Sequence, residues 1–107
     1  MWPFSADQPA NAALLSITHE AAFELLSVRE GDGARQPLRM EGKQTVDFSV
    51  DGVRRETREM LAKIKGMEGE RVRANAEKLG HALDGSWKED GEASQELARF
   101  MSKFVDA

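Results

Sequence analysis

The stretch "VRRETREMLAKIKGMEGERVRANAEKLGHAL", residues 53–83, decides the fold. Apolar residues recur along it at the three- and four-residue spacing of an α-helix, and they form two separate stripes. The first stripe predicts a helix over residues 53–65, and the second predicts a helix over 69–88. Gly66 and Gly69 stand between them. Because each stripe marks a helix face that must be buried, we expect the two helices to form a helical hairpin.

A third amphipathic stripe, the strongest of the three, predicts a C-terminal helix over residues 92–105. Its apolar residues share the spacing of one helix face: Ala93, Leu97, Phe100, Met101, Phe104 and Val105. A large apolar side chain contributes roughly 1.5–3 kcal/mol when it is buried, whereas an exposed stripe forms a sticky patch. We therefore expect this helix to be covered, either by the other helices or by a second copy of the chain.

The N-terminal half is less regular. Residues 8–20 predict a helix, with Asp7 as a candidate N-cap and Pro9 in the first turn, where its missing N–H costs nothing. The next run, residues 21–28, fits either a continued helix or a short buried strand, because periodicity cannot separate the two in so short a segment. Glycine, proline and mixed polar residues then predict a long loop over 31–52.

These elements predict a single domain over residues 1–107. The expected fold is mainly α, with about four helices in a small bundle and at most one short strand. A chain of 107 residues can bury one modest core. Its stability should then lie on the order of 5–15 kcal/mol.

Composition excludes several classes of function. The chain has no cysteine, which rules out disulfides, thiol catalysis and thiolate metal sites. No apolar run reaches the roughly 18 residues of a membrane span, and no basic segment of a signal peptide opens the sequence. We therefore expect a cytoplasmic protein without membrane contact, and secretion by another route stays open.

The charges give no basic face for nucleic acid. Arg54, Arg55 and Arg58 form a small arginine cluster, and Glu56 and Glu59 are interleaved with them. This alternation is typical of a solvated helix face, whereas nucleic-acid binding requires a concentrated positive patch. No nucleic-acid partner is predicted.

The two histidines do not predict an enzyme site. His19 and Glu20 begin like the zinc-binding HExxH helix, but Phe23 stands where the second histidine is needed. His81 has no partner that the sequence identifies, so a Ser-His-Asp arrangement is not predicted either. We predict no catalytic residue, no metal and no cofactor.

Asp7 and Gln8 are the residues with the clearest chemistry for a ligand. A carboxylate beside a carboxamide at a helix start can hold two neighbouring sugar hydroxyls, since acceptor and donor groups lie within a few ångströms of each other. The alternative is a simple N-cap for the helix that follows. The local sequence leaves both interpretations open.

The sequence from Trp2 to Gln8 also resembles a known motif. "WPFSADQPANAALLS", residues 2–16, resembles the end of the nucleotide-sugar signature of UDP-glycosyltransferases, which closes on W-P-x-x-x-[DE]-Q followed by an asparagine and a helix. The likeness continues through "EGERVRANAEKL", residues 68–79, and "WKEDGEASQELARFMSKF", residues 87–104. The insert around Gly31–Gly42 is most similar to the fungal branch of that family.

The resemblance implies a fragment of a fold with two Rossmann-like domains. In that family the C-terminal domain binds the UDP-sugar, so Asp7 and Gln8 would contact sugar hydroxyls and Trp2 would lie near the sugar pocket. The parts that hold uracil and diphosphate, the acceptor domain and the catalytic histidine have no counterpart in this sequence. The chain therefore resembles the C-terminal segment, starting inside the signature, and a non-catalytic role is favoured while the question of enzyme activity stays open.

Three functions follow as expectations. The first is a non-catalytic helical protein that acts through protein contacts as a homo-oligomer, normally a dimer. Its expected interface combines aromatic and aliphatic residues of both ends: Trp2, Phe4, Leu97, Phe100, Met101 and Phe104. The second is a lectin-like protein that binds a sugar, glycan or UDP-sugar through Asp7, Gln8 and Trp2. The third is a subunit of a split glycosyltransferase, with a partner chain supplying the other domains.

Overall fold

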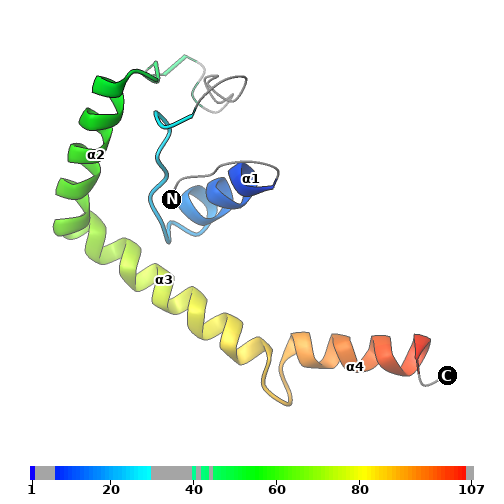
Figure 1. Ribbon diagram of the computed structural model, residues 1–107. Coiled ribbons are helices and arrows are strands. Elements are labelled where there is room, and N and C mark those ends of the chain that lie inside the picture. Colours follow the sequence, from blue (N-terminus) through cyan, green and yellow to red (C-terminus); the bar gives the residue numbers. More distant parts are fainter. Residues whose placement is uncertain (2–6, 30–39, 41, 44, 106–107) are drawn as a thin grey trace.

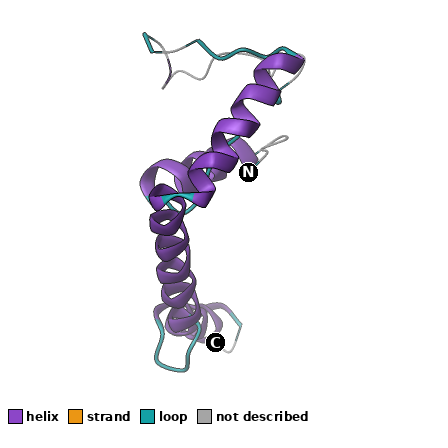
Figure 2. Cartoon of the chain, turned by 90° about the vertical axis from the view of Figure 1, so that its left-hand side faces the viewer, coloured by secondary structure: helices purple, strands orange, loops and turns teal. Residues whose placement is uncertain are grey.

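The computed structural model describes residues 1, 7–29, 40, 42–43 and 45–105, and it is mainly helical. The described α-helices are α1 (Gln8–Ala13), α2 (Val50–Lys65), α3 (Met67–Ser86) and α4 (Glu92–Phe104), and the π-helical turn η1 (Leu14–Thr18) continues α1. Over these residues the structure contains no β-strand (Figure 2). The prediction of a mainly α fold with about four helices is therefore confirmed.

Helix α2 begins three residues before the predicted start because a serine caps it. The Ser49 hydroxyl accepts a hydrogen bond from the backbone N–H of Gly52 at 3.1 Å, and Ser49 itself has the extended backbone of an N-cap. Asp51 in the first turn and Lys65 in the last turn both suit the helix dipole. The helix therefore includes residues that the spacing of apolar residues had assigned to the preceding loop.

Helices α2 and α3 meet end to end at Gly66, which ends one helix and caps the other. The chain bends there and does not fold back as the expected hairpin (Figure 1). Two contacts hold the bend. Arg73 donates to the carbonyl of Ile64 at 2.9 Å, and Gly69 packs so closely that a Cβ atom on it would lie 2.0 Å from the Ile64 carbonyl oxygen.

The helices form an open arc, and among the described residues the close helix–helix packing is between neighbours in the chain: α1 with η1, α2 with α3, and α3 with α4 (Figure 1). The molecule measures 58 × 34 × 22 Å, with a radius of gyration of 18.5 Å. A compact domain of this length would have a radius of gyration of about 13 Å. Among the residues that the structure describes, the arc therefore leaves much of each helix surface exposed.

The buried core is correspondingly small. Among the described residues, the apolar side chains that are buried belong to Ala12 and Val72. The large apolar residues that stay exposed occur on every helix or its flanking turn, and they include Leu14, Ile17, Val50, Leu61, Met67, Leu83, Trp87, Leu97, Phe100 and Phe104. None of the described helices is both long and apolar enough to cross a membrane.

Candidate functional site

Residues 21–26 form an extended segment between α1 and α2 (Figure 1). Neither the continued helix nor the assigned strand that the sequence left open is present there. Its hydrogen bonds nevertheless resemble those of a sheet: the Met1 ammonium donates to the Phe23 carbonyl at 2.5 Å, and the Leu25 N–H donates to the Met1 carbonyl at 2.8 Å. Met1 therefore bonds to the residues on both sides of Glu24, which is the hydrogen-bond pattern of two parallel strands.

A carboxylate of α2 holds the end of this segment. Glu56 accepts hydrogen bonds from the backbone N–H of Leu26 at 2.8 Å and of Ser27 at 2.9 Å, and it also accepts from the Ser27 hydroxyl. Bonds to an ionised acceptor are stronger than neutral ones. Ser27 is buried, and Glu56 links the end of the extended segment to α2 by these hydrogen bonds.

A second polar contact joins the end of η1 to α3. Glu20 has a backbone φ of +48°, a value that residues other than glycine rarely adopt. Its carboxylate pairs with Arg71 at 2.9 Å, and its carbonyl accepts from the Asn75 amide at 3.1 Å. Two residues of α3 thus stabilise the backbone at Glu20, where the chain turns from the π-helical turn into the extended segment.

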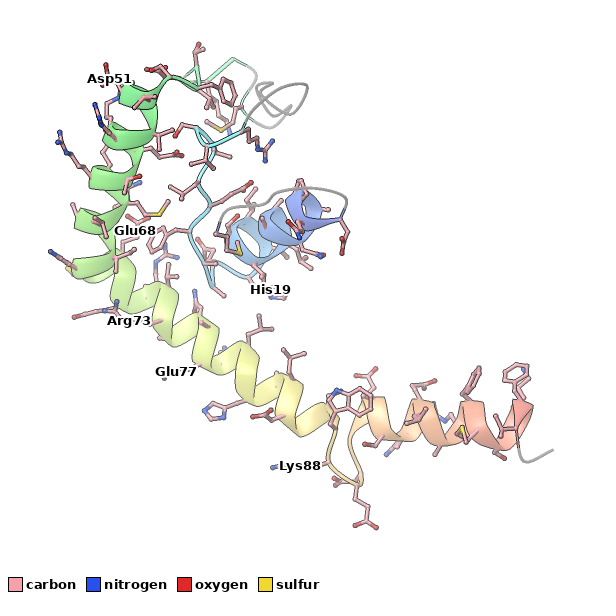
Figure 3. The ribbon with its side chains drawn as sticks, in the orientation of Figure 1. His19, Asp51, Glu68, Arg73, Glu77 and Lys88 are labelled. Carbon is pink, nitrogen blue, oxygen red and sulfur yellow. The ribbon has the colours of Figure 1, made fainter. Side chains whose placement is uncertain are left out.

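Beside this contact lies a pocket of about 320 Å³ between η1 and α3. Polar and apolar side chains both line it: Thr18, His19, Asn75, Lys78, Leu79 and Ala82. His19 is on the side of η1 that faces α3 (Figure 3). Among the described residues no group of three or more histidines or carboxylates is placed to hold a metal ion.

Asp7 and Gln8 lie together at the start of α1, and both are exposed. The Asp7 side chain makes no capping hydrogen bond to the helix. Its carboxylate instead accepts from the side-chain amide of Asn11 at 2.9 Å, one turn along the helix. A carboxylate and a carboxamide are therefore paired at this helix end, next to Gln8 in the chain, and such groups can accept from and donate to hydroxyl groups.

The remaining predicted site residues lie in two other places. Trp2 and Phe4 fall outside the described residues. The predicted interface residues of α4 are exposed, with 51% exposure for Leu97, 54% for Phe100 and 64% for Phe104. Since α1 does not contact α4, Asp7 and Gln8, which are adjacent in the chain, lie apart from α4 (Figure 1).

A smaller pocket of about 130 Å³ lies at the start of α2 and shows the clearest electrostatic effect. Asp47 accepts from the Ser49 N–H at 2.9 Å and from the Arg55 guanidinium at 2.7 Å. Hydrogen bonds from the Ser49 side chain and backbone, followed by that from Arg55, lower the pKa of Asp47 below its ordinary value. Asp47 therefore stays ionised and fixes the turn that leads into α2.

Sequence reasoning missed Glu56 and the Glu20 contacts. The partners of Glu56 lie about 30 residues away along the chain, and Asn75 lies 55 residues from Glu20. An isolated glutamate in a charged helix face carries no local signal of such a partner. The helical positions of Arg71 and Asn75, four residues apart on α3, were the only regularity that could have pointed to a shared target.

The sequence is similar to part of a known protein. The chain is 34% identical over 94 residues to the UDP-glycosyltransferase eriJ of Hericium erinaceus. That match covers 86% of this chain and 18% of the relative, so the chain spans about a fifth of the length of the curated protein it matches. No protein-family model and no solved structure matches. The chain is therefore similar to one part of a UDP-glycosyltransferase.

Proposed function

We propose that this chain is a non-catalytic helical protein that resembles the C-terminal part of a UDP-glycosyltransferase and acts through protein contacts. The observation that carries the proposal is the exposed apolar face of α4, together with the small core. With only Ala12 and Val72 buried among the apolar described residues, most of the hydrophobic stabilisation available to the helices depends on a partner surface. A second copy of the chain is the proposed partner.

Sedimentation equilibrium tests this proposal directly. The expected result is a dimer whose dissociation constant is about 10 μM, an affinity that a modest interface can provide. Leu97→Ser should weaken the dimer because it places a hydroxyl in the apolar face. Leu61→Ser is the matched control, since Leu61 on α2 is equally exposed at 51%. A single species of 11.9 kDa at every concentration would contradict the proposal.

The second candidate is sugar binding at the start of α1 through Asp7 and Gln8, and Trp2, which lies outside the described residues, is the third residue that the sequence predicts for it. The specific observation in its favour is that Asp7 makes no capping bond and lies beside Gln8 and Asn11. The similarity to a UDP-glycosyltransferase supports the same candidate. Both a free sugar and a UDP-sugar are proposed ligands, and the affinity of a site with few contacts should be weak.

Isothermal titration with UDP-glucose, UDP and a panel of free sugars distinguishes the candidates. Sugar binding that is lost in Asp7→Ala and in Gln8→Ala supports the second candidate. Asp51→Ala is the matched control, because Asp51 is an exposed aspartate at the start of α2 (Figure 3). Absence of binding would leave protein contacts as the function. Transferase activity that appears only with a second polypeptide would instead support a split enzyme.

A further inference from the structure

The apolar face of α4 has the spacing of a short coiled-coil seam. Ala93, Leu97, Phe100 and Phe104 follow one another at intervals of four, three and four residues. Leu97 and Phe104 therefore take the a positions of a heptad, and Ala93 and Phe100 take the d positions. The rings of Phe100 and Phe104 already contact each other, with centroids 5.1 Å apart, and α4 projects away from the other helices (Figure 1).

The charges of α4 are divided along its length. Glu92 and Glu96 lie in the first half, and Arg99 and Lys103 lie in the second half. In the heptad defined by the apolar residues, Glu96 and Lys103 occupy the two g positions, which flank the seam. A helix that is acidic at one end of its seam and basic at the other is complementary to a copy of itself running in the opposite direction.

We infer that two copies of the chain associate by antiparallel packing of α4 against α4, in one defined register. This inference rests on the proposed self-association and adds its geometry. A twofold axis between Ala98 and Arg99 places Leu97 opposite Phe100 of the second copy, and Ala93 opposite Phe104 of that copy. Each large side chain thus faces a complementary one, and the small Ala93 leaves room for a phenylalanine ring.

The same register pairs the flanking charges. Glu96 of each copy faces Lys103 of the other, so the symmetric interface contains this ion pair twice. A parallel arrangement would place Glu96 opposite Met101 of the second copy, with no ion pair at all. Within one chain Lys103 lies over the Phe104 ring at 5.1 Å, which keeps it along the seam, whereas Glu96 pairs with Arg99 and would exchange this partner for Lys103 of the second copy.

Charge exchange tests the register. Glu96→Lys alone and Lys103→Glu alone each turn both ion pairs into like-charge pairs, and each should raise the dimer dissociation constant roughly tenfold or more. An equimolar mixture of the two variants should form heterodimers of about wild-type affinity, because opposite charges then meet again. The double variant E96K/K103E should recover the homodimer for the same reason. Sedimentation equilibrium measures all four.

A control variant and separate outcomes keep the test clear. Glu92→Lys reverses a charge at a c position outside the seam and should leave the affinity nearly unchanged, and circular dichroism checks that every variant keeps its helices. A wild-type dimer that is insensitive to the single exchanges, or singles that the mixture does not rescue, would overturn the antiparallel register but not the proposed function. A wild-type chain that is monomeric throughout would overturn both.

Discussion

Glu56 is the residue that fixes the extended segment to the helical arc. Its carboxylate accepts from two consecutive backbone N–H groups and from the Ser27 hydroxyl. Without it, the N–H groups of Leu26 and Ser27 would have no partner in the described structure, and Ser27 is buried. An unsatisfied buried donor costs more than the hydrogen bond itself contributes.

Replacing this carboxylate should therefore destabilise the protein. Glu56→Gln puts an amide N–H2 group where an acceptor is needed, and we expect the free energy of unfolding to fall by about 1–3 kcal/mol. Chemical denaturation followed by circular dichroism measures the change. Glu59→Gln is the control, because Glu59 is an exposed glutamate of the same helix and should change stability by less than about 0.5 kcal/mol. Equal effects of the two substitutions would contradict the assigned role of Glu56.

The lowered pKa of Asp47 predicts that the stability of the folded protein decreases at acidic pH. The Ser49 hydrogen bonds and Arg55 lower its pKa in the folded state relative to the ordinary value of 3.8. The contribution of Asp47 to stability is therefore complete above pH 3.8 and is lost as the pH falls through the lower pKa of the folded protein. Thermal unfolding between pH 6 and pH 2 should show this loss in the wild type, and Asp47→Asn should remove that part of the acid dependence. A variant with the wild-type pH profile would refute the assignment.

At the level of single residues, the sequence could predict chemistry but not contacts. Asp7 and Gln8 were recognisable because they are adjacent and open a helix, and the structure adds that Asp7 does not cap that helix with its side chain. Glu20 and Glu56 were not recognisable, because their partners are brought close only by the fold. The positive φ of Glu20 depends on Arg71 and Asn75 in the same way.

Among the elements, the helices were predictable because periodic apolar residues define them. The predicted helices over 53–65, 69–88 and 92–105 correspond to α2, α3 and α4. The relation between α2 and α3 was not predictable from periodicity. A one-residue junction at Gly66 gives an end-to-end bend, and the tight packing of Gly69 against Ile64 and the Arg73 hydrogen bond to the Ile64 carbonyl hold it.

Two glycines of α3 should respond in opposite ways to the same substitution. Gly69→Ala places a Cβ atom against the Ile64 backbone, and we expect it to destabilise the protein by roughly 1–3 kcal/mol. Gly80→Ala meets nothing within 4 Å and should stabilise α3 by about 0.5–1 kcal/mol, since alanine loses less backbone entropy than glycine. Chemical denaturation compares both with the wild type. If Gly69→Ala stabilises the protein as Gly80→Ala does, the bend is not held by this close packing.

For the whole molecule, the open arc and the small core limit how stable one chain can be. The sequence predicted which helix faces are apolar. It could not predict that few of these faces pack against one another within one chain, because the packing depends on the angles between helices at Gly66 and at residues 87–91. Helix α4 lies far from α1, which carries the buried Ala12, and the two make no contact (Figure 1). Stability should therefore depend on association.

This dependence predicts a melting temperature that changes with chain concentration. If the apolar face of α4 is buried between two copies, mass action stabilises the folded dimer as concentration rises, and a hundredfold increase should raise the Tm by roughly 5–10 °C. Phe104→Ser should lower the Tm and reduce its concentration dependence, because it removes a ring from the seam. Leu83→Ser, an exposed apolar position on α3, should keep the dependence. A Tm that is constant across the range in the wild type would mean that a single chain holds the arc without a partner, and association could not then be what stabilises it.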